Sequence, residues 1–210
     1  TQLIARRVRE LDVYSEILPW DISPEKIKAI KPKGIILSGG PESVTKLNTP
    51  RVPEIIFQLD IPILGICYGM QTLAEQFGGQ VRRSKTKEFG HTQIHIEKSS
   101  LLFDGFSSGS SLDVWMSHGD TVSTLPDKFN IIASTSSAPI AAMEHSERPI
   151  FALQFHPEVT HTNKGNAVLH NFISKICKCT AQWKIENLIE QRIQEIKEKV
   201  RDEKVLLGLS

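Results

Sequence analysis

With 210 residues, the chain is long enough for one α/β domain and a piece of a second. Its formal net charge of +1, with both signs interspersed, does not indicate a nucleic-acid partner, and the one dense basic stretch, residues 82–87, is expected to be a solvated loop. An odd number of cysteines does not suggest a disulfide framework, and no apolar stretch reaches the ~18 residues that a membrane-spanning helix needs. We therefore expect a cytoplasmic protein that does not contact a membrane.

The N-terminal part of the chain alternates between helix and strand patterns. Residues 3–11 carry an apolar stripe with helical spacing. Residues 23–25, Ser-Pro-Glu, are typical of a helix start, because a capping hydroxyl precedes proline at the first helical position. Strands are expected at residues 14–18 and 34–37, and a helix at residues 52–59. Strands separated by helices indicate a parallel sheet with right-handed connections.

The most informative feature is a cysteine between a strand pattern and a helix pattern. The apolar run at residues 61–66 predicts a buried strand, and residues 72–77 predict a helix. Cys67 lies at the turn between them, with Gly65 and Gly69 two residues away on either side, which is the spacing of a nucleophile elbow. We expect its side chain to be exposed at the carboxyl edge of the sheet, where the positive end of the following helix favours the thiolate. A free cysteine buried at a strand end is the alternative.

The second half of the chain has the texture of antiparallel strands. Strand patterns occur at residues 92–97, 112–116, 130–134, 140–143 and 150–155, and the last two predict a hairpin. Residues 165–176 predict a closing helix.

The last thirty or so residues do not fit this domain. A helical apolar stripe is followed by an apolar strand pattern at residues 205–207. The stripe consists of Ile185, Leu188, Ile189, Ile193, Ile196 and Val200. We expect one domain at residues 1–180 and the truncated start of a second α/β domain at residues 181–210.

A cysteine nucleophile needs a base, and the base needs a group that orients it. The apolar strand pattern at residues 151–155 is followed directly by His156, Pro157 and Glu158. Alternation along a strand points His156 and Glu158 toward the same face, and proline belongs at a strand end because it cannot donate to the ladder. On its own the His-x-Glu pattern is equally compatible with a structural role. Together with Cys67 it predicts a catalytic triad.

Two polar turns are candidates for the surroundings of the nucleophile. Glycines at residues 38–41, Ser-Gly-Gly-Pro, let backbone N–H groups approach a ligand, and they could supply one oxyanion-hole donor beside the N–H of Tyr68. An ordinary tight turn is the alternative. Residues 117–120, Ser-His-Gly-Asp, end a predicted strand and either line a substrate pocket or form a polar loop.

Other constellations are incomplete. The His-x-Glu pattern lacks the second motif of the zinc deaminases, and Cys177 and Cys179 have no second ligand pair, so no metal site is expected. The remaining histidines have no partner pattern and are expected on the surface or in strands: His91, His95, His145, His161 and His170.

Four motifs together resemble the class I (triad) glutamine amidotransferases. They are Gly-Ile-Cys-Tyr-Gly-Met-Gln (65–71), Ser-Gly-Gly-Pro-Glu-Ser (38–43), Met-Ser-His-Gly-Asp (116–120) and Gln-Phe-His-Pro-Glu-Val (154–159). More narrowly, residues 6–11, 88–90 and 156–162 are similar to the glutaminase domain of the bacterial GMP synthetase family. The resemblance covers essentially the whole chain. It implies an α/β, flavodoxin-like fold with an open, mixed and mostly parallel sheet flanked by helices.

The resemblance also implies a mechanism. Cys67 would attack the side-chain amide of L-glutamine, and the N–H groups of Gly40 and Tyr68 would form the oxyanion hole. His156, held by Glu158, would protonate the departing ammonia and then activate water. Three further residues would lie around the glutamine: Gln71, His118 and Asp120.

Partners follow from the same resemblance. The intact enzyme would pass ammonia to a synthetase domain of the same chain, which converts XMP to GMP with ATP and Mg, and it would be a homodimer. No cofactor is expected within the present residues. Family members begin with a strand before Thr1 and continue past Ser210 into a Gly-rich ATP-binding loop. We therefore expect a chain without its first strand that carries only the first helix and strand of the synthetase domain.

Two other hypotheses stay open. The first is another amidotransferase, of the anthranilate or CTP synthase type, or a related peptidase-like cysteine hydrolase. Those relatives do not share an amphipathic helix followed by Val-Leu-Leu-Gly-Leu-Ser at residues 205–210. The second is a non-catalytic interaction module, against which the presence of Cys67, His156 and Glu158 together argues.

Overall fold

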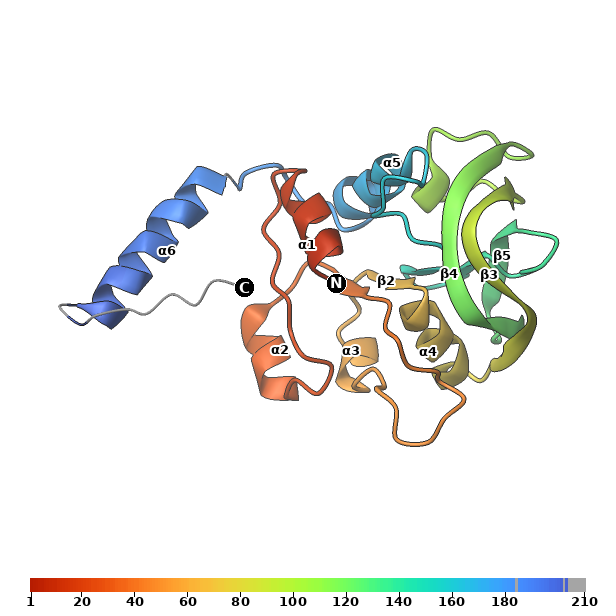
Figure 1. Cartoon of the computed structure of the whole chain (residues 1–210), viewed down its shortest axis with the longest axis horizontal. Helices are drawn as coiled ribbons and strands as arrows, with labels where there is room; N and C mark the ends of the chain where they lie inside the picture. Colours follow the sequence, from red (N-terminus) through yellow and green to blue (C-terminus); the bar gives the residue numbers. More distant parts are fainter. Residues whose placement is uncertain (184, 202, 204–210) are drawn as a thin grey trace.

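The computed structural model describes residues 1–183, 185–201 and 203, without the side chains of residues 85, 86 and 185–192. In this part of the chain, seven strands form one sheet in the order β1-β2-β7-β6-β5-β3-β4 (Figure 1). The strands are β1 (Ile35–Leu37), β2 (Ile63–Ile66), β3 (Gln80–Ile96), β4 (Ser111–Thr124), β5 (Phe129–Ser134), β6 (Ala142–His145) and β7 (Ile150–Leu153). The helical elements are α1 (Gln2–Arg9), α2 (Pro24–Ile30), α3 (Ile55–Gln58), α4 (Tyr68–Gln76), η1 (Leu101–Phe103), α5 (Gly165–His170), η2 (Asn171–Ile176) and α6 (Ile185–Val200).

The sheet is mixed but mostly antiparallel, so the prediction of a mostly parallel sheet is wrong. β1 pairs with β2 and β2 with β7 in parallel, whereas the pairings β7–β6, β6–β5, β5–β3 and β3–β4 are antiparallel. The reason lies in the connections. A helical crossover joins β1 to β2, but β3 to β4 and β5 to β7 follow one another without a crossover helix, which brings antiparallel strands together. Parallel pairing is confined to the part of the sheet that carries the cysteine.

Helices cover both faces of the sheet, as an α/β fold requires. Alternation along β2 places Ile63 in one apolar core and Ile66 in the other. Ile4 of α1 and Leu169 of α5 belong to the same core as Ile66, whereas Leu73 of α4 packs with Ile63. The strand that leads to the cysteine is therefore buried on both sides.

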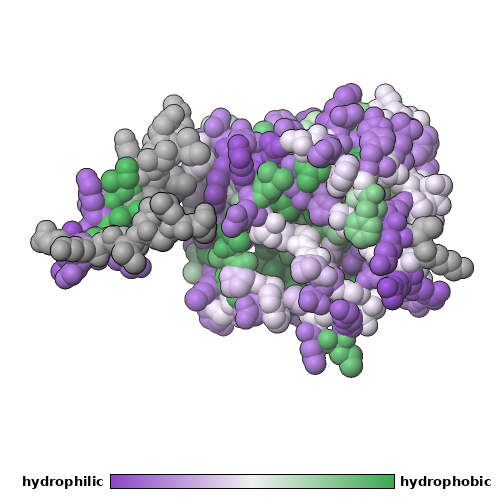
Figure 2. Space-filling model, in the orientation of Figure 1, coloured by the Kyte–Doolittle hydropathy of each residue, from purple (hydrophilic) through white to green (hydrophobic). Residues whose placement is uncertain are grey.

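The predicted strand at residues 14–18 is wrong. The segment has no regular structure, and Tyr14, Ile17 and Leu18 remain exposed. An apolar pattern is not sufficient, because the backbone N–H and C=O groups of a strand need a neighbour, and none of the described strands pairs with this segment. Figure 2 shows apolar surface around α1 and α2 on this side of the molecule.

β3 and β4 extend beyond the apolar patterns that predicted them. The basic stretch at residues 82–87, expected as a solvated loop, lies within β3, where the pairing register shifts between Arg83 and Glu88. Residues 117–120 lie within β4 rather than at its end. The helix predicted at residues 52–59 is shorter than expected and is limited to α3.

The C-terminal helices match their patterns. α5 continues directly into η2. The two elements together span the closing helix predicted at residues 165–176. α6 confirms the helix at residues 185–200, and Figure 1 shows it extending away from the rest of the chain. The predicted strand at residues 205–207 lies outside the described residues, and the domain boundary near residue 180 stays a prediction. None of the described helices combines the length and apolarity needed to cross a bilayer.

Candidate active site

β2, Cys67 and α4 form the predicted strand–turn–helix unit. Cys67 has φ 54° and ψ −106°, a conformation that is strained for a residue with a Cβ atom. A Cβ atom on Gly65 would lie 2.7 Å from the carbonyl oxygen of Gly69, and one on Gly69 would lie 2.1 Å from that of Leu37. Both glycines are therefore required, because the first turn of α4 approaches β2 and the end of β1 at backbone distance.

The side chain of Cys67 is less exposed than predicted. Cys67 is only 6% exposed, but it lines a cavity of about 470 Å³. The cavity is bounded by residues 40–43 and Lys46, by Tyr68 and Gln71 of α4, by Arg83, Lys87 and Phe89 of β3, and by residues 117–120 of β4. The sulfur is thus reached through a cavity and not from an open surface.

His156 and Glu158 follow β7 and face each other, as predicted. Nδ1 of His156 lies 2.8 Å from a carboxylate oxygen of Glu158, and since a carboxylate only accepts, Nδ1 donates and Nε2 is left for Cys67. Burial lowers the pKa of His156, but hydrogen bonds to Cys67 and Glu158 and the charges of these two groups outweigh burial and raise the pKa to about 10. The imidazolium is therefore the resting form at neutral pH.

Gly39 lies between the cysteine and the histidine. A Cβ atom on Gly39 would lie 3.1 Å from Cε1 of His156 and 3.6 Å from Cβ of Cys67, so the missing side chain gives the imidazole its space. The sequence indicated the turn at residues 38–41 as part of the site, but it did not indicate that Gly39 leaves space for the imidazole of His156. Gly40, implied by the resemblance as an oxyanion donor, lies in the cavity wall, where an added Cβ would be 3.9 Å from the ring of Tyr68.

Gln154 is a neighbour of the sulfur that the sequence analysis missed. It is fully buried, and its Nε2 lies 3.8 Å from Sγ of Cys67. Its Oε1 accepts a hydrogen bond from Nε2 of Gln71 at 3.4 Å. An amide N–H directed at the sulfur stabilises a thiolate. The available signal was a single polar residue within the otherwise apolar strand pattern at residues 151–155.

The structure brings together the three residues implied to surround a substrate. Nε2 of Gln71 donates to the carbonyl oxygen of Asp120 at 2.8 Å, and Nδ1 of His118 lies 3.0 Å from the same oxygen. Nε2 of His118 lies 2.9 Å from Glu88, a close contact without the alignment of a hydrogen bond. Burial lowers the pKa of His118 more than Glu88 raises it. All three residues line the cavity, and their role toward a substrate stays a prediction.

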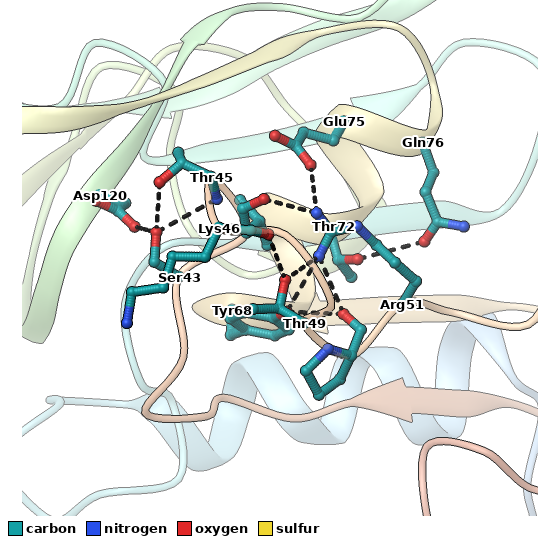
Figure 3. A network of polar contacts seen from close by, with 12 residues as sticks. Ser43, Thr45, Lys46, Thr49, Arg51, Tyr68, Thr72, Glu75, Gln76 and Asp120 are labelled. Atoms are coloured by element: carbon teal, nitrogen blue, oxygen red, sulfur yellow. Dashed lines mark hydrogen bonds and ion pairs between the residues drawn. The ribbon is translucent and has the colours of Figure 1, made fainter.

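One wall of the cavity belongs to a segment without regular structure, residues 41–52, which is held by side-chain hydrogen bonds (Figure 3). The guanidinium of Arg51 donates to the carbonyl oxygen of Val44 at 2.6 Å and to the carboxylate of Glu75 in α4 at 3.0 Å. It also donates to the hydroxyl of Thr49 at 2.7 Å. Arg51 therefore connects residues within this wall to one another and also connects the wall to α4, the helix that follows Cys67.

Further bonds connect the same wall to α4 and β4. The hydroxyl of Tyr68 donates to the carbonyl oxygen of Pro50 at 2.7 Å. The side-chain amide of Gln76 bonds both backbone groups of Val52, at 3.0 and 2.9 Å. The hydroxyl of Ser43 donates to the carboxylate of Asp120. No periodicity in the sequence predicts these contacts.

The other two cysteines are chemically different from Cys67. Burial raises the pKa of Cys177 to about 12, and it also raises that of Cys179. Both are therefore thiols at neutral pH. Among the side chains that the structure describes, no group of three His, Cys, Asp or Glu residues is arranged to hold a metal ion.

Comparison with known proteins shows the family of the chain. The family model of class-I glutamine amidotransferases matches residues 1–176. The whole chain is 54% identical to a glutamine-hydrolyzing GMP synthase of Hahella chejuensis, of which it covers 41%. The chain thus spans about two fifths of the length of the curated relatives that it matches.

Solved structures agree as well. The crystal structure of a proposed GMP synthase component from Thermoplasma acidophilum matches with a TM-score of 0.75 and 36% identity, covering 92% of this chain and 90% of that one. The glutaminase domain of a Trypanosoma brucei CTPS with bound acivicin shares the fold, with a TM-score of 0.63 and 19% identity over 87% of this chain and 88% of that one. The chain belongs to the class-I glutamine amidotransferase family.

Proposed function

We propose that this chain hydrolyses L-glutamine to glutamate and ammonia through Cys67, His156 and Glu158. One observation carries the proposal: a cysteine at a strained elbow lines a cavity of about 470 Å³, and a histidine bonded to a carboxylate at 2.8 Å lies against it. Membership of the family supports glutamine as the substrate.

In the first half of the reaction, the thiolate of Cys67 attacks the side-chain amide carbon of glutamine. The carbon–nitrogen bond breaks, a thioester forms, and the imidazolium of His156 gives its proton to the leaving nitrogen, which departs as ammonia. The raised pKa of His156 supports this role, because it keeps the proton on the ring at neutral pH until the proton is transferred to the leaving nitrogen.

In the second half, neutral His156 takes a proton from water while the water oxygen attacks the thioester. The carbon–sulfur bond breaks, glutamate leaves, and the sulfur of Cys67 is released beside the protonated ring of His156. Glu158 keeps its hydrogen bond to Nδ1 throughout; it fixes the tautomer of the ring and stabilises its positive charge.

The surroundings of Cys67 supply the remaining parts. The N–H groups of Gly40 and Tyr68 form the oxyanion hole, a role supported by the position of both residues in the cavity lining. Gln71, His118 and Asp120 lie around the glutamine. We assign the amide of Gln154 to the sulfur, because its nitrogen lies 3.8 Å away.

We further propose that the ammonia is used by a synthetase domain, which converts XMP to GMP with ATP and Mg in a cytoplasmic homodimer. The GMP synthases of which the chain spans about two fifths support this assignment over the anthranilate or CTP synthase type. Ile193 and Ile196 of α6 are 48% and 60% exposed, which suits a helix that packs on another domain. The start of that domain is proposed at residue 181, and ATP and Mg would be held outside the described residues.

Formation of glutamate and ammonia from glutamine tests the proposal. The chain is assayed alone and with the separately expressed synthetase domain of the Hahella chejuensis relative, beside a Cys67→Ser variant as the matched control. We expect glutamate and ammonia in equal amounts from the parent and neither from the variant. A folded parent that is inactive under both conditions, or a variant as active as the parent, would contradict the proposal.

A further inference from the structure

His156 and Glu158 lie beyond the end of the strand that delivers them. β7 ends at Leu153, and the last backbone bond toward β6 runs from the N–H of Gln154 to the carbonyl oxygen of Ala141, at 2.8 Å. Pro157, between the two residues, has no N–H to donate. The pairing of β7 with β6 therefore does not fix the backbone on which the acid–base pair depends.

A ring of three hydrogen bonds holds the backbone of His156 instead. The N–H of His156 donates to the carbonyl oxygen of Trp115 in β4 at 3.0 Å, and the N–H of Trp115 donates to the hydroxyl oxygen of Thr162 at 3.0 Å. That hydroxyl donates its one proton to the carbonyl oxygen of His156 at 2.6 Å. Thr162 is buried and is the only side chain in the ring, so its hydroxyl closes the link between the histidine and β4.

A second side chain holds the backbone of Glu158. Nε of Arg7, in α1, donates to the carbonyl oxygen of Glu158 at 2.9 Å, and Nη1 of Arg7 pairs with Glu10 at 2.8 Å. The carboxylate of Glu158 bonds His156 through one oxygen, while its other oxygen is buried and has no hydrogen-bond partner among the described residues. The direction of this side chain is therefore set largely by its backbone.

The surrounding packing leaves this backbone little freedom. A Cβ atom on Gly165, at the start of α5, would lie 2.1 Å from the carbonyl oxygen of Pro157. The N–H of Asn163 donates to the carbonyl oxygen of Asp113 in β4 at 3.0 Å. The turn that contains Thr162 is thus fastened to β4 on one side and pressed against the proline on the other.

We propose that Thr162 and Arg7 are positioning residues of the acid–base pair, because they hold the backbone carbonyl groups of His156 and Glu158. The proposal rests on the proposed glutaminase function. Neither residue lines the cavity, so each acts through the pair and not on the substrate. The imidazole must reach the sulfur and the carboxylate at the same time, and a displacement of about 1 Å can cost as much as 100-fold in rate.

Thr162→Val and Thr162→Ser test the first anchor. Valine keeps the branched shape and removes the hydroxyl, whereas serine keeps the hydroxyl. For Thr162→Val we expect kcat to fall about 10- to 100-fold with KM within about 2-fold of the parent, because positioning acts on the chemical step. Thr162→Ser should return kcat to within about 3-fold of the parent.

Arg7→Met and Glu10→Gln test the second anchor, and they also decide the matter if Thr162→Val does not fold. Methionine keeps the aliphatic length and removes the bond to Glu158. Glu10→Gln removes the negative charge that pairs with Arg7 and with Arg6, and leaves the bond from Arg7 to Glu158 in place. We expect Arg7→Met to lower kcat about 10-fold at constant KM, and Glu10→Gln to leave kcat within about 2-fold.

A readout that is independent of turnover separates positioning from stability. NMR titration of the His156 imidazole, assigned by its absence in His156→Gln, should show a midpoint at least about one unit lower in Thr162→Val and Arg7→Met than in the parent, because a displaced carboxylate stabilises the imidazolium less. Unchanged midpoints, or losses of kcat that only follow the folded fraction, would overturn the proposal. Failure of the glutaminase proposal is distinguishable, since the parent itself would then release no glutamate.

Discussion

The proposed catalytic centre, formed by Cys67, His156 and Glu158, and the cavity wall at residues 41–52 are built in different ways. Cys67 lies at the junction of β2 and α4, and its N–H donates to the carbonyl oxygen of Leu153 in β7 at 2.7 Å, so the sheet fixes the backbone of the proposed nucleophile. The wall belongs to no helix or strand, and side chains fix it, above all Arg51 (Figure 3). Because separate groups hold the two regions, we expect the rate of the chemical step and the affinity for substrate to depend on different residues. Variants should therefore separate kcat from KM.

The largest effect is expected in the catalytic centre. His156→Ala removes both the proton donor and the proton acceptor, whereas Glu158→Gln keeps the shape and can still accept from Nδ1. We expect kcat for glutamine hydrolysis to be lower in His156→Ala than in Glu158→Gln by ~10-fold or more. Equal rates in both variants and the parent would show that His156 and Glu158 have a structural role and take no part in proton transfer.

A smaller effect, on KM and not on kcat, is expected for a variant in the cavity wall at residues 41–52. Arg51→Met removes the hydrogen bonds that hold residues 44 to 51 against α4, so we expect KM for glutamine to rise about 10-fold with kcat within about 3-fold of the parent. Arg82→Met is the matched control, since Arg82 is exposed and bonds only Gln80 among the contacts described for it. A fall in kcat at constant KM would contradict this expectation and would show that Arg51 acts on the chemical step.

The charge of the catalytic centre should also appear in the stability of the protein. His156 has a pKa of about 10 in the folded state against 6.5 ordinarily, so its stabilising contribution is complete below about pH 6.5 and is lost as the pH rises toward 10. Glu158→Gln removes one cause of the raised pKa. The difference in unfolding free energy between parent and variant, from urea unfolding, should therefore shrink between pH 6.5 and 10. A difference that grows over this range would contradict the assignment.

The smallest effect is expected outside both regions. A chain that ends after Trp183 keeps the bond from the N–H of Trp183 to the carbonyl oxygen of Asp12, at 2.9 Å, and loses α6. We expect its melting temperature to stay within about 2 °C of the parent, with improved solubility, because the exposed Ile193 and Ile196 contribute little to the glutaminase core. A chain that ends after Gln182 should be slightly less stable.

A fall of many degrees in the chain that ends after Trp183 would show that α6 packs against the glutaminase core. The domain boundary proposed near residue 180 would then be wrong.

The strand–turn–helix unit around Cys67 and the contact of His156 with Glu158 were predictable from the sequence because their signals are local. Gly65 and Gly69 mark the close approach of backbones around Cys67, and the proline in His-Pro-Glu marks a strand end. The role of Gly39 and the contact of Gln154 with the sulfur were not predicted, since both arise where distant segments meet.

The errors have a common physical origin. A strand pattern such as that at residues 14–18 leads to a strand only if a neighbour exists, and none of the described strands supplies one. The direction of pairing depends on the connections, which a pattern of strands does not specify in the second half of the chain. The bond that joins Arg51 to α4 spans 24 positions, from Arg51 to Glu75, which is longer than the windows in which helix and strand patterns are read.

Competition among the three cysteines for a glutamine-like electrophile tests the central claim most directly. The intact chain is treated at neutral pH, and the labelled positions are determined by peptide mass mapping over time. We expect Cys67 to be modified first, because it lines the cavity beside an imidazolium, whereas burial raises the pKa values of Cys177 and Cys179 and keeps them as thiols. Glutamine should slow the labelling of Cys67 alone. Earlier labelling of Cys177 or Cys179, or no protection of Cys67 by glutamine, would contradict the account.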